Sequence, residues 1–438
     1  MIISGKNRVL LLVLILLSLT IIMLGCDKQN GNEIKVDASA GNNNESEINE
    51  KQPEPEEESK SSGILLGIKS RKLDKRGDSY NSYTEGIRGS NFYEEKPQYK
   101  TLYITNNKGN VALSTQGSGV LVPRNNDFWL LNIETEKDKD KYKDFNYNSN
   151  VDFISAKKVN SSAVKKFTKE YKSGELAKKW YENYYSGDPK YFSNDIGLEL
   201  IFVGCDYITQ RVTDDGYNGG VRGRCAHWLT TIPFNETNKI DVYDDYIREI
   251  EGISSDTEVK EVDISEVLGN DVETQFLEIG NKYLENTEYG DSYCLQGKDG
   301  WGFFRQNSKW MVKGYILCSS GCGRGIYGIF NTDIVPPNQI VSHDTLIPAW
   351  DAIKTSIPDA KDAFSSPEKD MLIVLTTKEL RVYTDFRDDY IGEVAYVIDL
   401  GDIIDSEEEK EVDVIMAQWA TGDYVEKWEN EAKKYLKE

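Results

Sequence analysis

Histidine, the side chain whose ordinary pKa lies nearest neutral pH, is scarce in this chain. It has two histidines, His227 and His343, among 438 residues. It contains no Gly-x-Ser-x-Gly elbow, no His-Glu-x-x-His pattern and no Gly-Lys-Ser/Thr phosphate loop. Catalysis by a Ser-His-Asp triad would therefore depend on one of the two histidines. We expect His343, which Asp344 follows, to be an ordinary surface residue, so the motifs predict no catalytic site.

Cysteines are the other reactive residues, and five of the six follow residue 200. Cys205 and Cys225 flank a predicted hairpin, and Cys318 and Cys322 would close a small loop. Both pairs are candidate disulfides, and the odd number leaves at least one thiol without a partner in the same chain. The alternative is a zinc site made of Cys225, His227, Cys318 and Cys322. Closed zinc sites have tighter paired spacing than this, so we expect no metal and no other cofactor.

The sixth cysteine ends an apolar segment near the start of the chain. Lys6 and Arg8 precede the apolar run from Val9 to Leu24, and Gly25 and Cys26 follow it. This order is typical of a secretory signal peptide over residues 1–25, and it resembles the lipobox of bacterial lipoproteins. The resemblance implies a lipid on Cys26, which would hold the protein on the outer face of the cell membrane. An uncleaved transmembrane anchor is the alternative, but the run is shorter than the roughly 20 residues that a spanning helix needs.

Residues 26–62 differ sharply in composition from the C-terminal remainder of the chain. Asn, Glu, Ser, Gln and Pro dominate this segment, and it has no aromatic residue. It cannot bury enough apolar surface to offset the entropy lost on ordering. We therefore predict an acidic, disordered tether between the anchor and a folded region over residues 63–438.

Charge and size restrict the function of the folded region. The chain has 52 basic and 74 acidic residues, a formal net charge of −22. Such an excess repels nucleic-acid phosphates, so we expect no nucleic-acid partner. A folded region of this length exceeds the usual limit of about 250–300 residues for one hydrophobic core, which predicts two domains or a repeated architecture. A sub-boundary would fall near residues 155–195.

Apolar runs across Asn, Gly and Lys turns predict a mainly β fold made of antiparallel hairpins, with a few helices. The ranges 99–105, 110–114, 119–122 and 128–133 form one group of four strands, and 371–375, 380–384, 393–400 and 412–419 form another. Four strands are the content of one propeller blade, which is compatible with a β-propeller-like fold, although no period repeats between the two groups; two smaller α+β domains are the alternative. Helices are predicted over 164–185, 272–284, 348–356 and 424–436.

The C-terminal region carries a second resemblance. The stretches Ser366–Val374 (SPEKDMLIV) and Met416–Val425 (MAQWATGDYV) resemble uncharacterised surface lipoproteins of spore-forming Gram-positive bacteria. The resemblance implies a location on the cell surface and no particular activity. It agrees with the cell-surface location that the segment ending at Cys26 predicts.

Three functions are compatible with these patterns. The first is a non-enzymatic binding or interaction module at the cell surface, whose partner is a cell-wall polymer or an envelope protein. The second is a carbohydrate-active enzyme, since paired carboxylates leave no signature in so acidic a chain. The third is an envelope-stress or lysozyme-binding factor, which the negative charge would suit. We expect the first.

Overall fold

The computed structural model describes residues 60–72, 96–139, 148–159, 164–167, 192–218, 221–234, 262–286, 293–318, 328–404 and 410–436. The predicted signal peptide, Cys26, Cys322 and the tether up to residue 59 lie outside these ranges. Residues 58–438 form one unit. Within the described ranges, no helix is both long and apolar enough to cross a membrane.

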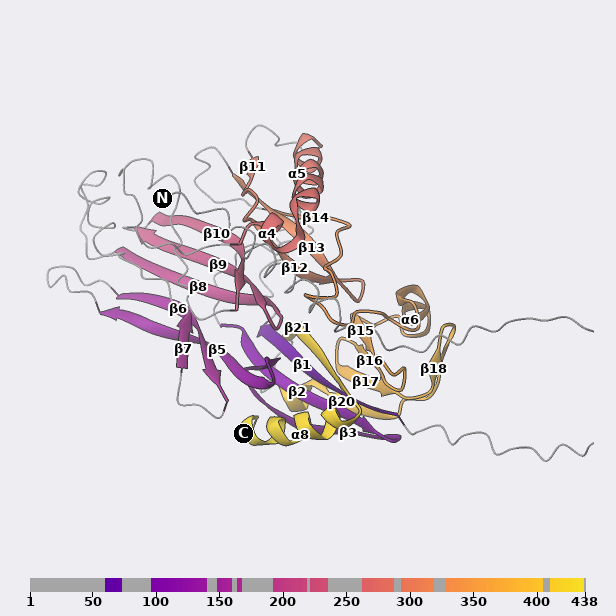
Figure 1. The fold of residues 1–438 in the computed structure, drawn as a ribbon. Coiled ribbons are helices and arrows are strands. Elements are labelled where there is room, and N and C mark those ends of the chain that lie inside the picture. Colours follow the sequence, from indigo (N-terminus) through magenta and orange to yellow (C-terminus); the bar gives the residue numbers. More distant parts are fainter. Residues whose placement is uncertain are drawn as a thin grey trace, which may run out of the picture. The chain divides into compact units, whose positions relative to one another are not determined.

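The first sheet joins the beginning and the end of the folded region. Its strand order is β21-β1-β2-β3, from strands Lys410–Thr421, Ser61–Lys72, Gln98–Asn107 and Asn110–Ser118. The inner strand β1 is antiparallel to β2 on one side and to β21 on the other (Figure 1). The hairpin between β2 and β3 turns at Lys108 and Gly109, whose φ angles of 56° and 90° belong to the left-handed region that tight two-residue turns require.

The second sheet is the largest, with the order β10-β9-β8-β6-β5-β4 and β7 beside β6. Its strands are β4 (Val120–Arg124), β5 (Asp127–Lys139), β6 (Asn148–Lys158), β7 (Val164–Phe167), β8 (Phe192–Val203), β9 (Tyr207–Asn218) and β10 (Val221–Pro233). All pairs are antiparallel except β6 with β8. Because β6 and β8 belong to one sheet, the predicted sub-boundary near 155–195 does not separate two sheets.

The third sheet has the order β11-β13-β12, with β14 also paired to β13. It contains β11 (Tyr293–Leu295), β12 (Trp301–Gln306), β13 (Lys309–Cys318) and β14 (Gly328–Asn331). Helices α4 (Ile264–Leu268) and α5 (Asn270–Glu285) precede it. The α5 residue Phe276 is fully buried against Phe330 of β14, with ring centroids 5.2 Å apart, so the apolar side of α5 covers this sheet.

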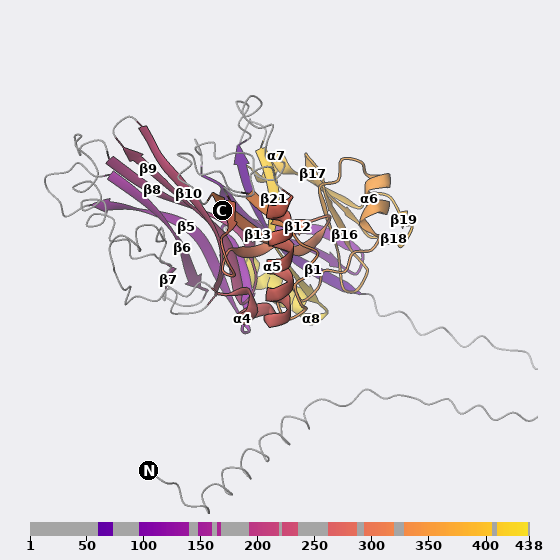
Figure 2. The same ribbon diagram turned by 90° about the horizontal axis from the view of Figure 1, so that it is seen from above.

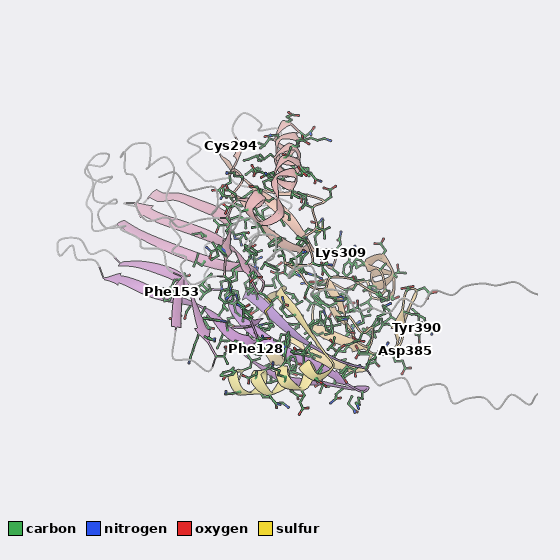
Figure 3. All side chains as sticks on the ribbon, in the orientation of Figure 1. Phe128, Phe153, Cys294, Lys309, Asp385 and Tyr390 are labelled. Carbon is green, nitrogen blue, oxygen red and sulfur yellow. The ribbon has the colours of Figure 1, made fainter. Side chains whose placement is uncertain are left out.

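The fourth sheet has the order β15-β16-β17-β20, from Asp362–Ser365, Leu372–Leu375, Glu379–Tyr383 and Tyr396–Asp399. Helix α6 (Trp350–Ser356) precedes it, and α7 (Leu400–Ile403) follows β20. A separate hairpin, β18 (Phe386–Arg387) with β19 (Tyr390–Ile391), lies beside α6 (Figure 2). Asp385 and Tyr390 at this hairpin are labelled in Figure 3. Gly392 N donates a hydrogen bond to Asp385 O at 2.8 Å, which joins the two ends of the hairpin.

Each of the four larger sheets contacts the sheet that follows it in the chain, and the fourth sheet contacts the first. Leu65 on one face of β1 packs into the core of the second sheet, whereas Ile64 and Leu66 on the other face pack against the fourth sheet. Phe202 of the second sheet packs on Phe303 of the third, with ring centroids 4.9 Å apart. Arg305 of the third sheet forms an ion pair with Asp362 of the fourth. The first sheet, which holds the first and last strands, thus closes the series.

The mainly β prediction is confirmed, and the five antiparallel sheets have a propeller-like arrangement. The sheets contain between two and seven strands, so they are not copies of one repeat. The C-terminal helix α8 (Asp423–Tyr435) packs on the first sheet, where Tyr103 OH donates a hydrogen bond to Val425 O at 2.8 Å.

The structure corrects three predictions about elements. The predicted groups of four strands are each divided: β2 and β3 belong to the first sheet and β4 and β5 to the second, while β21 leaves the fourth sheet to pair with β1. Residues 164–167, predicted as the start of a helix, form strand β7, because pairing with β6 overrides the helical spacing. The folded region also begins slightly earlier than residue 63, since β1 starts at Ser61.

Candidate ligand-binding pocket

A cavity of about 360 Å³ lies where four of the sheets meet. This volume falls within the range that is usual for small-molecule sites. Its lining includes residues of β1, β8, β9, β12, β14, β15, β16 and β21. Polar and charged residues form much of the wall: Lys69, Arg71, Glu199, Arg211, Arg305, Gln306, Asn307, Ser308, Lys361, Asp362, Glu411 and Asp413.

Strand pairing places the charges on this wall. Residues two apart on a strand face the same side, so Lys69 and Arg71 of β1 both point to the pocket. In the register with β21, Lys69 lies opposite Asp413 and Arg71 lies opposite Glu411. Lys69 Nζ is 3.2 Å from Asp413 Oδ2, and Arg71 Nε is 3.1 Å from Glu411 Oε2. The first sheet therefore contributes two cross-strand ion pairs to the pocket.

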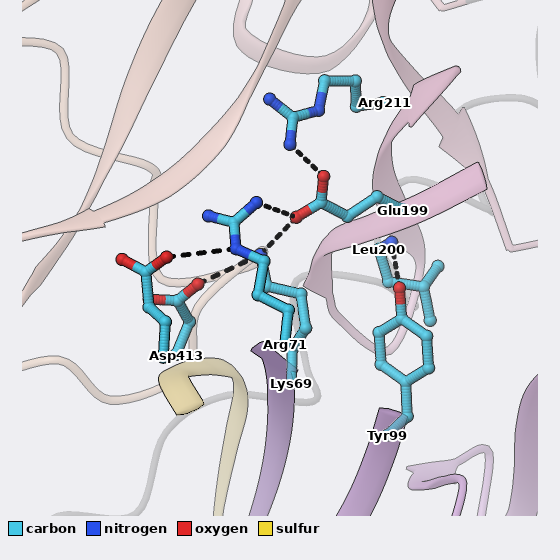
Figure 4. Close-up of polar contacts among 8 residues, drawn as sticks. Lys69, Arg71, Tyr99, Glu199, Leu200, Arg211 and Asp413 are labelled. Atoms are coloured by element: carbon cyan, nitrogen blue, oxygen red, sulfur yellow. Dashed lines mark hydrogen bonds and ion pairs between the residues drawn. The ribbon is translucent and has the colours of Figure 1, made fainter. Parts of the chain in front are cut away.

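Glu199 of β8 is the centre of the network (Figure 4). It lies opposite Arg211 of β9, which donates from Nη2 to Glu199 Oε2. On its other oxygen, Glu199 Oε1 accepts hydrogen bonds from Lys69 Nζ at 2.7 Å and from Arg71 Nη1 at 3.3 Å. Three cations from two sheets thus converge on one carboxylate whose side chain is 4% exposed.

The network fixes the protonation state of Glu199. Burial alone would raise the pKa of this carboxyl, but the charges of Arg211, Lys69 and Arg71 outweigh burial and hold the pKa well below its ordinary value. Burial likewise acts to lower the pKa of Arg71, and the charges of Glu199 and Glu411 reverse that effect and raise it. Both groups are therefore charged at every physiological pH.

A second buried ion-pair group supports the pocket from the third sheet. Arg305 of β12 donates from Nε and Nη2 to the two oxygens of Asp362, at 3.0 and 2.7 Å, and from Nη1 to Asp344 Oδ1 at 2.7 Å. Its guanidinium also lies 4.4 Å from the ring centroid of Phe364. Burial raises the pKa of Asp344, although Arg305 opposes that rise. The planar, bidentate contact between Arg305 and Asp362 connects the third sheet to the fourth.

Three polar groups on the wall have no partner among the described residues. The hydroxyl of Ser308 is buried, as is Oε1 of Gln306, and neither makes a hydrogen bond. Lys361 is exposed and forms no ion pair with a described residue. Gln306 is the last residue of β12, and Ser308 belongs to the turn between β12 and β13, where Asn307 and Ser308 have φ angles of 50° and 57°. Buried polar groups are nearly always satisfied, so Ser308 Oγ and Gln306 Oε1 stand out on the wall as buried atoms to which no described residue gives a hydrogen bond.

The predicted Cys205–Cys225 disulfide is wrong. Cys205 is a free thiol in the turn between β8 and β9, with Sγ 3.1 Å from the carbonyl oxygen of Pro123. Cys225 lies opposite Asp215 in the register of β9 with β10, near the other end of that hairpin. At about 3.3 Å per residue the two cysteines are roughly 30 Å apart, whereas a disulfide needs Cα atoms within about 7 Å. Burial raises the pKa of the Cys205 thiol to about 11.

The remaining residues singled out from the sequence do not gather at the pocket. Cys318 is the last residue of β13, opposite Tyr293, and its predicted partner Cys322 lies outside the described residues. His343 is half-buried rather than fully at the surface, and its Nε2 lies 2.9 Å from Ser365 O. His227 belongs to β10, opposite Thr213. Among the described residues, no group of three His, Cys, Asp or Glu side chains is placed to hold a metal ion.

Sequence patterns did not reveal the pocket. The one local signal was Glu199, a charge between apolar residues in the run from Gly197 to Val203. A charge buried in a strand needs a partner, but its partners on β1 are about 130 residues away in sequence. No known family model matches the chain, and a comparison with characterised proteins gives no significant match.

Proposed function

We propose that this chain is a cell-surface lipoprotein, held on the outer face of the cell membrane by a lipid on Cys26. In this proposal, its β-rich body is a non-enzymatic module that binds a ligand or partner through the pocket between the four sheets. One observation carries the binding function: a cavity of about 360 Å³ whose wall combines fixed ion pairs with polar groups that lack partners. Such a preformed polar site is suited to recognition.

The charge network favours binding over glycoside cleavage. A glycosidase needs one carboxylic acid that is protonated near neutral pH and a second carboxylate at a defined distance from it. Glu199, the most buried acid on the wall, has a lowered pKa because three cations surround it. A carboxyl in that setting is a poor proton donor. The same cations make the wall rigid, which reduces the entropy lost when a ligand binds.

The proposed partner is a polymer of the cell wall or another envelope protein. A lipid anchor would keep the module within reach of both. The net charge of −22 disfavours nucleic acid as a partner.

Palmitate labelling tests the anchor. Wild-type protein and the Cys26→Ser variant would be expressed in a Gram-positive bacterium with labelled palmitate. We expect label and processing only in the wild type, because the thiol is the acceptor. Equal labelling of the variant would refute the anchor.

Cosedimentation tests the binding function. Full-length protein in detergent would be mixed with purified peptidoglycan sacculi that carry wall teichoic acid, and envelope proteins would be captured in parallel by in-cell cross-linking. We expect sedimentation with the polymer or one reproducible cross-linked partner, and no change in the polymer. New reducing ends would show an enzyme instead, and absence of both polymer binding and cross-links would refute the module.

A further inference from the structure

We propose that the pocket binds a small organic anion with several hydroxyl groups, and that acidic sugars are the ligand class that fits it. This inference rests on the proposed binding function and specifies its ligand. It follows from the charges that the wall leaves uncompensated, the polar atoms that it leaves without partners, and the apolar surface between them.

Among the residues that line the pocket, cations outnumber carboxylates by one. Four carboxylates line the pocket, and each has a cation as its partner: Glu199 with Lys69, Arg71 and Arg211; Asp413 with Lys69; Glu411 with Arg71; and Asp362 with Arg305. Of the five lining cations, Lys361 alone has no carboxylate among the described residues. A ligand with an anionic group at Lys361 would complete the pairing without breaking any existing contact.

The turn between β12 and β13 supplies the hydrogen-bonding requirement. Ser308 is 2% exposed, yet its hydroxyl has no partner, and the same holds for Gln306 Oε1 on the adjoining strand. An amide oxygen accepts hydrogen bonds only, whereas a hydroxyl both donates and accepts. A ligand hydroxyl satisfies either group, and a ligand with several hydroxyls satisfies both. A plain anion such as acetate has no donor for Gln306 Oε1, so it cannot satisfy all three groups.

Apolar residues fill the wall between these polar groups. Phe304 and Ile329 of the third sheet and Val414 of β21 line the same cavity. Sugars present C–H groups between their hydroxyls, so a mixed wall of this kind suits them better than a uniformly polar wall. A purely apolar ligand would leave Ser308 and Gln306 unsatisfied, and a cationic ligand would meet Lys361 and Arg71.

Binding of small probes to the full-length protein in detergent tests the inference by titration calorimetry. The probes are D-glucuronate and D-glucose 6-phosphate, methyl glucoside as the neutral sugar, glucosamine as the cationic sugar, and acetate and inorganic phosphate as anions without hydroxyl groups. We expect the two acidic sugars to bind at least about tenfold more tightly than every other probe. The ratio of the dissociation constants of D-glucuronate and D-glucose 6-phosphate then shows whether the pocket prefers a carboxylate or a phosphate.

Three variants locate the site. Lys361→Gln removes the free charge, and Lys282→Gln on the exposed side of α5 is its control. Ser308→Gly removes the hydroxyl at a left-handed position, and Asn126→Gly is its control, because Asn126 has a φ of 60° in the corresponding turn between β4 and β5. Gln306→Leu removes the acceptor. We expect each pocket variant to weaken binding of the acidic sugar at least about fivefold, and the controls to leave it unchanged.

The outcomes separate this inference from the function on which it rests. Equal binding of acidic and neutral sugars, or unchanged binding by Lys361→Gln, overturns the ligand class. Absence of binding by all six probes also overturns it, while sedimentation with the cell-wall polymer or a cross-linked partner would still support the binding module. Variants that lose binding must keep the wild-type thermal midpoint; Gln306→Leu serves as the second test if Ser308→Gly does not fold.

Discussion

Removing the charge of Glu199 while keeping its shape should destabilise the protein strongly. Gln occupies nearly the same volume and still offers one acceptor oxygen, so Glu199→Gln changes little besides the charge. Three cations then remain around a site that is 3% exposed. Breaking a buried ion pair by removing one partner costs about 3–5 kcal/mol. Because Lys69 keeps Asp413 and Arg71 keeps Glu411, we expect about 3 kcal/mol, the lower end of that range.

Urea unfolding measures this loss. With a slope of about 3 kcal/mol per molar urea, a loss of about 3 kcal/mol moves the unfolding midpoint down by about 1 M. Glu411→Gln is the matched control, because Glu411 pairs with Arg71 at a more exposed position, with 29% of its side chain accessible. That change should cost less than about 1 kcal/mol. A Glu199→Gln midpoint within 0.2 M (roughly 0.6 kcal/mol) of the wild type would refute the reasoning.

Three further outcomes are expected. The folded-state pKa of Glu199 lies well below its unfolded value of about 4.5, so the stability that this charge contributes is present above pH 4.5 and is lost as the pH falls further. Below pH 4.5, the free energy of unfolding should therefore fall less steeply with decreasing pH in Glu199→Gln than in the wild type, by up to about 1.4 kcal/mol per pH unit. Equal slopes in the two proteins would contradict this. Arg305→Lys should lower the free energy of unfolding, measured by calorimetry, by about 2–4 kcal/mol, because an ammonium group cannot bind both oxygens of Asp362 as the guanidinium does. The control, Arg387→Lys at an exposed position, should change it by less than about 0.5 kcal/mol. Cys205, whose thiol pKa is raised to about 11, should react with iodoacetamide at pH 8 at least about tenfold more slowly in the folded protein than in the unfolded protein. Peptide mass spectra measure the alkylation of Cys205 over time, and equal rates in the two states would argue against its burial.

Local patterns were sufficient to predict most strands and the helices near the C-terminus. The prediction over 272–284 corresponds to α5, and that over 424–436 corresponds to α8. The hairpin turns were recognisable because consecutive left-handed residues favour Asn and Gly in a short loop, as at Asn125 and Asn126. Each of these signals lies within a few residues of the element that it predicts.

The grouping of strands into sheets was not predictable from such signals. β1 begins at Ser61 and pairs with β21, roughly 350 residues later in the chain. Nothing in the run from Gly63 to Lys72 identifies that partner. The pocket depends on the same long-range pairing, since the alternation of Lys69 and Arg71 matches that of Glu411 and Asp413 only once the register is known. In a chain with 74 acidic residues, two more acids near the end carry no distinctive signal.

The position of β1 also has a mechanical consequence. A pulling force applied through the residues before Ser61 enters the body at an inner strand, which is hydrogen-bonded to β2 and to β21 along nearly its whole length. An edge strand would peel away one bond at a time, but β1 must slide past both neighbours, so many bonds share the load at once. The first sheet is therefore expected to resist a pulling force applied at Ser61 better than a sheet in which the pulled strand lies at the edge.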